Sequence, residues 1–169
     1  MAETIRQYKQ RILSYTRGRK PLAVQRATPA RLESLVRGRS RKQLARRPAP
    51  KKWSVAEILA HLADTEMAVG WRLRQVLSKS GIPIQAYDQN LWAASGKYAK
   101  RDPRQSLVLF RTVREANLRL LKSLSARQWK QYGVHSERGR ESMADIARMI
   151  AGHDLNHMLQ IQRILKSKP

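Results

Sequence analysis

Two of the four histidines lie four residues apart, in the stretch GHDLNHMLQI (152–161). Residues at i and i+4 of a helix are neighbours on one face, so His153 and His157 would present two imidazoles side by side. The same spacing runs through an apolar stripe, which places this face in a protein core: Ile146, Ile150, Ile161 and Ile164. Spacing alone leaves two interpretations open, a metal ion bound by both imidazoles or two core histidines bonded to other side chains.

A third candidate ligand is His61, in the stretch ILAHLADTE (58–66). It follows Ile58 by three residues, at or beside the inward face of an expected helix. Three histidines with an open fourth position are a common geometry of catalytic zinc. The chain has no cysteine, which excludes disulfides, a thiolate nucleophile and cysteine-based zinc sites. His135, in a loop beside glycine, is a weaker candidate for a fourth ligand or an acid.

The elements that must position these histidines are almost all helical. Apolar residues at helical spacing predict helices at about 3–15, 29–36, 54–78, 104–124 and 142–166, with short helical turns near 40–45 and 125–129. Ser54 and Glu57 have the S-x-x-E spacing of a capping box. Thr28 is expected as an N-cap, Pro29 as the first residue of its helix and Gly38 near that helix's end. No useful strand and no repeat is predicted.

These elements predict an all-α helical bundle in a single domain, 1–169. Residues 1–20 are expected to form an N-terminal helical extension that packs on the bundle.

Two irregular connections are candidates for the walls of a pocket. The first, SGIPIQAYDQNLWAASGKYAKRDPR (80–104), is too long for a plain turn. Its candidate wall residues are Tyr87, Asp88, Gln89, Asn90 and Trp92, although the favoured interpretation is that they cap one end of the bundle, with Trp92 buried. Trp53 and Trp71 are expected to be packing residues. From the second connection, KQYGVHSERGRE (130–141), Tyr132 and His135 are candidates to reach the site.

The charge is strongly positive, with 35 Lys and Arg against 12 Asp and Glu, a net charge of +23. The basic excess lies outside the two segments that carry the candidate site. A solvated surface is therefore the favoured interpretation, with Arg31, Arg37, Arg41 and Lys42 pointing outward. Non-specific nucleic-acid binding is the alternative partner, and natural adaptation and deliberate surface redesign both remain open as the origin of the charge.

No apolar run approaches the ~20 residues that a membrane-spanning helix needs. The N-terminal stretch is polar and lacks the apolar centre of a secretory signal. A cytoplasmic protein without a membrane partner is expected.

The histidine motifs carry a family resemblance. KWSVAEILAHLADTE (52–66), followed far downstream by IAGHDLNHMLQI (150–161), resembles the DinB/YfiT-like superfamily, together with ATPARLESL (27–35) and RRPAPKKWS (46–54). The resemblance implies a four-helix bundle with up-down-down-up topology. It also implies a divalent metal, zinc first and nickel second, bound by His61, His153 and His157.

Three further positions are read from the same family pattern. Asp64 matches the aspartate of an HLxD pattern; it would orient a ligand imidazole or accept a proton, or else make a surface or loop hydrogen bond. Asp154 stands where the family often has Glu, and Asn156 where it often has a further His. Neither aligns with a ligand, so these departures affect outer-sphere or proton-transfer roles and not metal binding.

The resemblance implies a metal-dependent hydrolase or a thiol-dependent S-transferase acting on a small-molecule substrate. A low-molecular-weight thiol would then come from a cofactor, because the chain has no cysteine. The alternatives are a metal-binding bundle without catalysis and a basic nucleic-acid-binding protein. The expected oligomeric state is a monomer or a homodimer.

Overall fold

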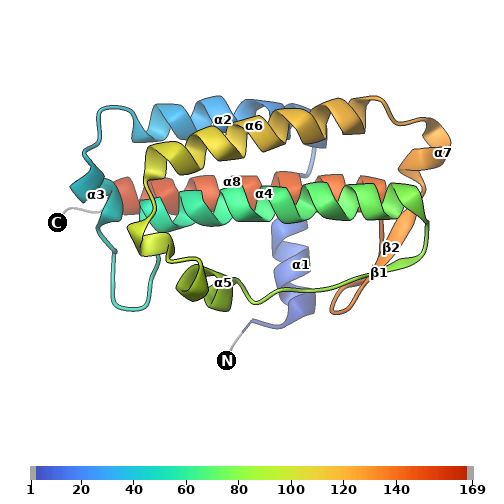
Figure 1. The fold of residues 1–169 in the computed structure, drawn as a ribbon, viewed down its shortest axis with the longest axis horizontal. Helices are drawn as coiled ribbons and strands as arrows, with labels where there is room; N and C mark the ends of the chain where they lie inside the picture. Colours follow the sequence, from blue (N-terminus) through green and yellow to red (C-terminus); the bar gives the residue numbers. More distant parts are fainter. Residues whose placement is uncertain (1–2, 167–169) are drawn as a thin grey trace.

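The computed structural model describes residues 3–166, so the ends of the expected 1–169 domain, residues 1–2 and 167–169, lie outside the described residues. Four long helices form a bundle, with α4 packed most extensively on α6, and α2 on α8. Figure 1 shows α4 and α6 running in one direction and α2 and α8 in the other, which is the up-down-down-up order. The long helices are α2 (Pro21–Val36), α4 (Val55–Ser78), α6 (Pro103–Lys122) and α8 (Met143–Lys166).

Two parallel neighbours cannot be joined by a tight turn, so the segment between α4 and α6 must return along the whole bundle (Figure 1). It does so as β1 (Ile82–Ile84), α5 (Gln89–Ser95) and the 3-10 helix η1 (Tyr98–Lys100). The shorter helices elsewhere are α1 (Ile5–Ser14), α3 (Arg41–Ala45) and α7 (Ala126–Trp129). The length of the first connection thus follows from the topology, and the elements of this segment pack against α4.

The start of α4 is the predicted capping box. The Ser54 hydroxyl accepts a hydrogen bond from the Glu57 amide at 3.2 Å, and Glu57 Oε2 accepts one from the Ser54 amide at 2.8 Å. Arg47 pairs with the same carboxylate, which burial would otherwise destabilise. The direction of the helix that carries His61 is therefore fixed at its first turn.

The predicted start of the second helix at Pro29 is wrong. The helix α2 begins at Pro21, which occupies the first turn, and Pro29 lies inside it. A proline inside a helix leaves the carbonyl of residue i−4 without its amide donor. Here that carbonyl belongs to Gln25, and Arg114 Nη1 from α6 donates to it at 3.2 Å. A tertiary contact thus replaces the missing helical hydrogen bond.

The absence of strands is a second wrong prediction. A three-stranded sheet of β1, β2 (Tyr132–His135) and β3 (Gly139–Ser142) lies at one end of the bundle. The β1 and β2 strands pair in parallel, with Ile84 opposite His135, and β2 and β3 form an antiparallel hairpin. Strands of three and four residues are too short to show alternation in a sequence, and the β1–β2 pairing joins segments about fifty residues apart.

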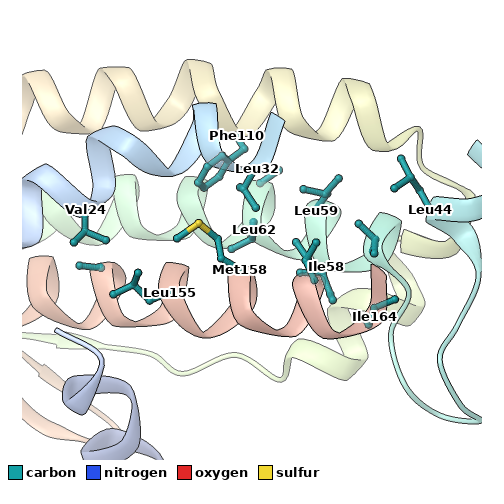
Figure 2. Packing of buried hydrophobic residues seen from close by; sticks show 14 residues of the cluster. Val24, Leu32, Leu44, Ile58, Leu59, Leu62, Phe110, Leu155, Met158 and Ile164 are labelled. Carbon is teal, nitrogen blue, oxygen red and sulfur yellow. The ribbon is translucent and has the colours of Figure 1, made fainter. Parts of the chain in front are cut away.

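The core follows the predicted apolar stripes. Figure 2 shows its larger cluster, where Phe110 and Met158 meet leucines and isoleucines from α2, α4 and α8. A second cluster lies toward the sheet and includes Val69, Leu73 and Ile146. These clusters bury most of one face of α4 and α8, and the histidines lie on those same two helices.

The basic residues named from sequence lie on the surface. Arg31, Arg37, Arg41 and Lys42 are all exposed, as expected of a solvated charge. Nucleic-acid binding stays a prediction. Among residues 3–166, no helix is long and apolar enough to cross a membrane.

Candidate metal centre

The three histidines predicted as ligands come together between α4 and α8. His61 Nε2 lies 3.1 Å from His153 Nε2, and His157 Nε2 lies 3.2 Å from the same atom. One ligand nitrogen from each ring lies within 4.8 Å of the others. His61 and His157 are buried, and His153 retains part of its surface. The three rings thus direct one nitrogen each toward a shared point.

Burial keeps these imidazoles neutral. Removal from water lowers the pKa of His61 to about 3, with a smaller contribution from His157. Burial likewise lowers the pKa of His157 to about 4 and holds the pKa of His153 well below its usual value. Neutral imidazole is the form that binds a metal, so all three rings are in the ligand state at neutral pH.

Neighbouring side chains fix the rings. His157 Nδ1 lies 2.9 Å from Gln160 Oε1, one turn further along α8. An amide oxygen can only accept, so Nδ1 carries the proton and Nε2 keeps its lone pair. The ring of Trp53 packs on His61 with centroids 4.9 Å apart and covers one side of the cluster. Both contacts are typical of the support around a metal-binding histidine.

Two of the three separations between the donor nitrogens match a small tetrahedral ion. Two nitrogens that each lie ~2.0–2.1 Å from such an ion are roughly 3.3 Å apart. Two of the three separations, 3.1 Å and 3.2 Å, are close to that value, and all three nitrogens lie within 4.8 Å of one another. Without an ion, the lone pairs that converge here have too few protons to satisfy them all. The three imidazoles would therefore hold a divalent metal.

A cavity of about 550 Å³ opens onto the cluster, and His61 and His153 form part of its wall. The predicted wall residues Tyr87, Asp88, Gln89 and Asn90 all line it, so they do not simply cap the bundle. His135 lines it as well.

The other aromatic predictions are mixed. Trp92 is not buried, with 37% exposed; it stacks on Tyr87 with centroids 4.0 Å apart and borders a neighbouring groove. Trp71 was expected to pack, but 65% of it is exposed. Tyr132 does not line the cavity; its ring packs under the Arg140 guanidinium.

Asp64 of α4 forms an ion pair with Arg101, in the segment between α4 and α6. Its Oδ1 accepts a hydrogen bond from Arg101 Nη1 at 2.6 Å, and the carboxylate is mostly buried. Among the described residues, no hydrogen bond joins it to a histidine. The ion pair holds the segment that follows α5 against the bundle, and the proton-accepting role of Asp64 stays a prediction.

The two departures from the family pattern have structural uses that the sequence did not reveal. Asp154 points away from the metal cluster and binds Arg114 through both oxygens, at 2.5 Å and 3.0 Å. Arg114 also donates to Glu66 at 2.7 Å. Asn156 accepts a hydrogen bond from Arg11 of α1 at 2.8 Å. One position thus joins α8 to α6, and the other holds the N-terminal helix.

The contact of α1 with α8 also contributes to the site, because Glu3, Ile5 and Tyr8 line the cavity. The two helices approach closely at Gly152, where an added Cβ would lie 2.2 Å from the Ile12 carbonyl oxygen. Only glycine permits this approach. The sequence did not predict that α1 forms part of the cavity wall. The only sign of this contact in the sequence is Gly152, the residue before His153.

Gly152→Ala is expected to displace α1 and destabilise the protein by roughly 1–3 kcal/mol. The reason is the backbone clash with Ile12, which no side-chain rotation relieves. Amide hydrogen exchange should show faster exchange in residues 5–14 and little change in α4. In an open helical position the same change would stabilise by about 1 kcal/mol. A more stable variant with unchanged protection of α1 would contradict the expectation.

The depressed histidine pKa values predict that the metal-free protein is acid-sensitive. The usual value is 6.5, and the folded values of His61 and His157 are about 3 and about 4. The unfolded chain therefore binds more protons below pH 6.5, so the free energy of unfolding falls as the pH drops from about 6.5 toward 4. Urea unfolding at pH 7, 6 and 5 measures the slope. His157→Gln should give a shallower slope, and equal slopes would contradict the assignment.

Comparison with known proteins identifies the family of this chain. The model of the DinB superfamily matches residues 25–161. A protein of Oceanobacillus iheyensis named "Putative metal-dependent hydrolase" is 28% identical over 116 residues, 69% of this chain and 67% of that one. YfiT of Bacillus subtilis, which carries the same description, is 28% identical over 109 residues, 64% of this chain and 61% of YfiT.

A solved structure of YfiT has the same fold. It superposes with a TM-score of 0.80 at 23% identity and covers 85% of this chain and 83% of that one. It is described as a "probable metal-dependent hydrolase with an unusual four-helix bundle topology". The match to the family model spans the segments that carry all three histidines, and this chain belongs to the DinB superfamily.

Proposed function

We propose that the protein is a zinc-dependent hydrolase of a small-molecule substrate, with His61, His153 and His157 as the metal ligands. The observation that carries the proposal is the convergence of three neutral imidazole nitrogens at the wall of a cavity of about 550 Å³. A cavity of this size accommodates a small molecule. The names of the relatives from Oceanobacillus and Bacillus agree with this class of chemistry.

A divalent ion held by three neutral ligands would keep its full charge, and when bound it would polarise a carbonyl or lower the pKa of a bound water or thiol. The residues of the chain provide the setting for this chemistry. Gln160 fixes the proton of His157 on Nδ1, and Trp53 covers His61 on one side. The cavity lies where His153 retains part of its surface, so a substrate would approach from that side.

Metal analysis of the protein purified without chelator is the first test. We expect about one zinc per chain, or uptake of one after dialysis against zinc, as for a site with three protein ligands and an open fourth position. If nickel is found in place of zinc, the identity of the metal in the proposal changes, but the three-histidine site is retained. A chain that neither carries nor takes up a divalent metal would overturn the proposal.

The reaction class is tested on the zinc-loaded protein with a panel of activated esters and amides, with and without added thiols. Turnover that depends on zinc and needs no thiol supports hydrolysis. Turnover that requires the thiol would make the protein an S-transferase, the second activity that the family resemblance implies. The metal-free protein is the matched control, and equal turnover without metal would exclude both.

A further inference from the structure

His135 is the fourth histidine of the chain, and it lies at the same cavity without belonging to the metal cluster. It is the last residue of β2, held between Ile84 of β1 and Gly139 of β3. Only 2% of the residue is exposed, yet it lines the cavity together with His61 and His153. The group of residues close enough to share a metal contains His61, His153 and His157 and not His135. His135 is thus placed to contact a ligand of the cavity and not the metal.

The local backbone selects one tautomer of this ring. The amide of Glu137 donates a hydrogen bond to His135 Nδ1 at 3.2 Å. Nδ1 therefore keeps its lone pair, and a neutral ring must carry its proton on Nε2. Burial, helped by Arg138, lowers the pKa of His135 to about 4, so the ring is neutral at pH 7.

The Nε2–H group has no acceptor of its own. Among the hydrogen bonds of residues 3–166, none involves His135 Nε2, and this nitrogen is not among the buried side-chain atoms that lack a partner, so it is open to the water of the cavity. A ligand that fills the cavity would displace this water and bury the donor, so the ligand must supply an acceptor. A carbonyl, carboxylate or hydroxamate oxygen meets this need, whereas an ammonium group does not.

We propose that His135 is a ligand-binding residue that donates a hydrogen bond from Nε2 to an oxygen of the substrate while the metal centre binds another part of the same molecule. The substrate class is then a compound with a carbonyl-type oxygen, such as an ester, an amide or a carboxylate. The proposal deepens the hydrolase function and rests on it. It adds a neutral donor on the sheet, opposite the helices that carry the metal ligands.

The tautomer is tested first, on the metal-free full chain labelled with ¹⁵N. Long-range ¹H–¹⁵N spectra at pH 7 should show His135 protonated on Nε2, with its signals assigned by their loss in His135→Asn. Acetohydroxamic acid, which offers two oxygens, should shift the Nε2 signal when added to the zinc-loaded protein. A ring protonated on Nδ1, or an Nε2 signal that does not move on binding, would overturn the proposal.

Binding of acetohydroxamic acid to zinc-loaded variants is tested next. His135→Asn should weaken its Kd by about tenfold or more, the equivalent of one lost hydrogen bond to a buried group. His135→Gln, whose amide nitrogen reaches the position of Nε2, should restore part of the loss. Val134→Ala is the matched control: it changes the same strand, but its side chain is 45% exposed on the opposite face.

Zinc affinity separates this proposal from the proposed function. All three variants should bind zinc within about twofold of the wild type, because none replaces a ligand. A large loss of zinc affinity in His135→Asn would make the residue part of the metal centre and overturn its role as donor. Failure of the wild type to bind zinc would refute the hydrolase, while the tautomer of His135 would still be measured on the metal-free chain, where a proton on Nδ1 would overturn the donor role.

Discussion

His153→Ala is expected to remove high-affinity zinc binding while leaving the bundle folded. His153 Nε2 lies 3.1 Å from His61 Nε2 and 3.2 Å from His157 Nε2, so it is the central member of the three. Loss of an outer-sphere partner of a metal ligand already reduces affinity by ~10–100-fold. Loss of a ligand should therefore reduce it by about 100-fold or more. Competition with a chromophoric zinc chelator measures the effect.

The fold should survive this change for two reasons. His153 retains part of its surface, so its truncation opens onto the cavity and not into a sealed core. Alanine also favours the helix. Far-UV circular dichroism should be unchanged, and Leu159→Ala on the exposed face of α8 controls for truncation in the same helix. Wild-type zinc affinity in His153→Ala would contradict the three-histidine centre.

Repeating patterns and local motifs could be predicted from the sequence. The apolar stripe through Ile146 and Ile161 gave the inward face of α8, and the Ser54 capping box fixed the start of α4. The position of His61 beside the inward face then brought it to the histidine pair of α8. The helical elements and the grouping of the three histidines follow from such local signals.

Features that depend on tertiary contact could not be predicted in this way. Pro29 carries the local signature of a helix start, yet Arg114 compensates the carbonyl that it leaves free, so the helix continues through it. His135 lay in a segment read as a loop, because β2 exists through its pairing with β1 and β3. These contacts join residues that lie far apart in the sequence, so no local periodicity predicts them.

The cavity also depends on contacts between segments that lie far apart in the sequence. Its wall is made from α1, α4, the first connection, the hairpin and α8, which are separate segments of the chain. Tyr87 and Asn90 were identified as candidates only from the length and composition of the connection. The contribution of α1 depends on Gly152 and Asn156, whose partners Ile12 and Arg11 are about 140 residues away.

Arg114→Met is expected to produce the largest loss of stability, about 3–5 kcal/mol. Arg114 is 1% exposed and neutralises two buried carboxylates, Glu66 at 2.7 Å and Asp154 at 2.5 Å. Without the guanidinium, two negative charges remain close together in the core. The loss is a large part of the 5–15 kcal/mol that stabilises a typical domain. Urea unfolding of the metal-free proteins at pH 7 measures it.

Removal of the charges distinguishes this cause from simple loss of packing. Arg114→Met combined with Glu66→Gln and Asp154→Asn should recover a substantial part of the stability, because no unpaired charge remains. Glu66 Oε1 also accepts a hydrogen bond from Asn117 at 2.8 Å, which glutamine can preserve through its own amide oxygen. A triple variant as unstable as Arg114→Met would show that shape, and not charge, determines the effect.

The hydrogen bond from Arg114 to the Gln25 carbonyl predicts that substitutions of Arg114 and Pro29 have coupled effects on stability. Arg114 Nη1 donates to the Gln25 carbonyl at 3.2 Å, and Pro29 has no amide proton to give it. Pro29→Ala restores that amide, so it should reduce the penalty of Arg114→Met by about 1 kcal/mol, the net value of one hydrogen bond. A double-mutant cycle on urea unfolding isolates this energy. Additive effects of the two substitutions would mean that the Gln25 carbonyl gains no stabilisation from Arg114. The expected coupling would instead mean that α2 depends on Arg114, the side chain that also anchors α8, the helix of His153 and His157.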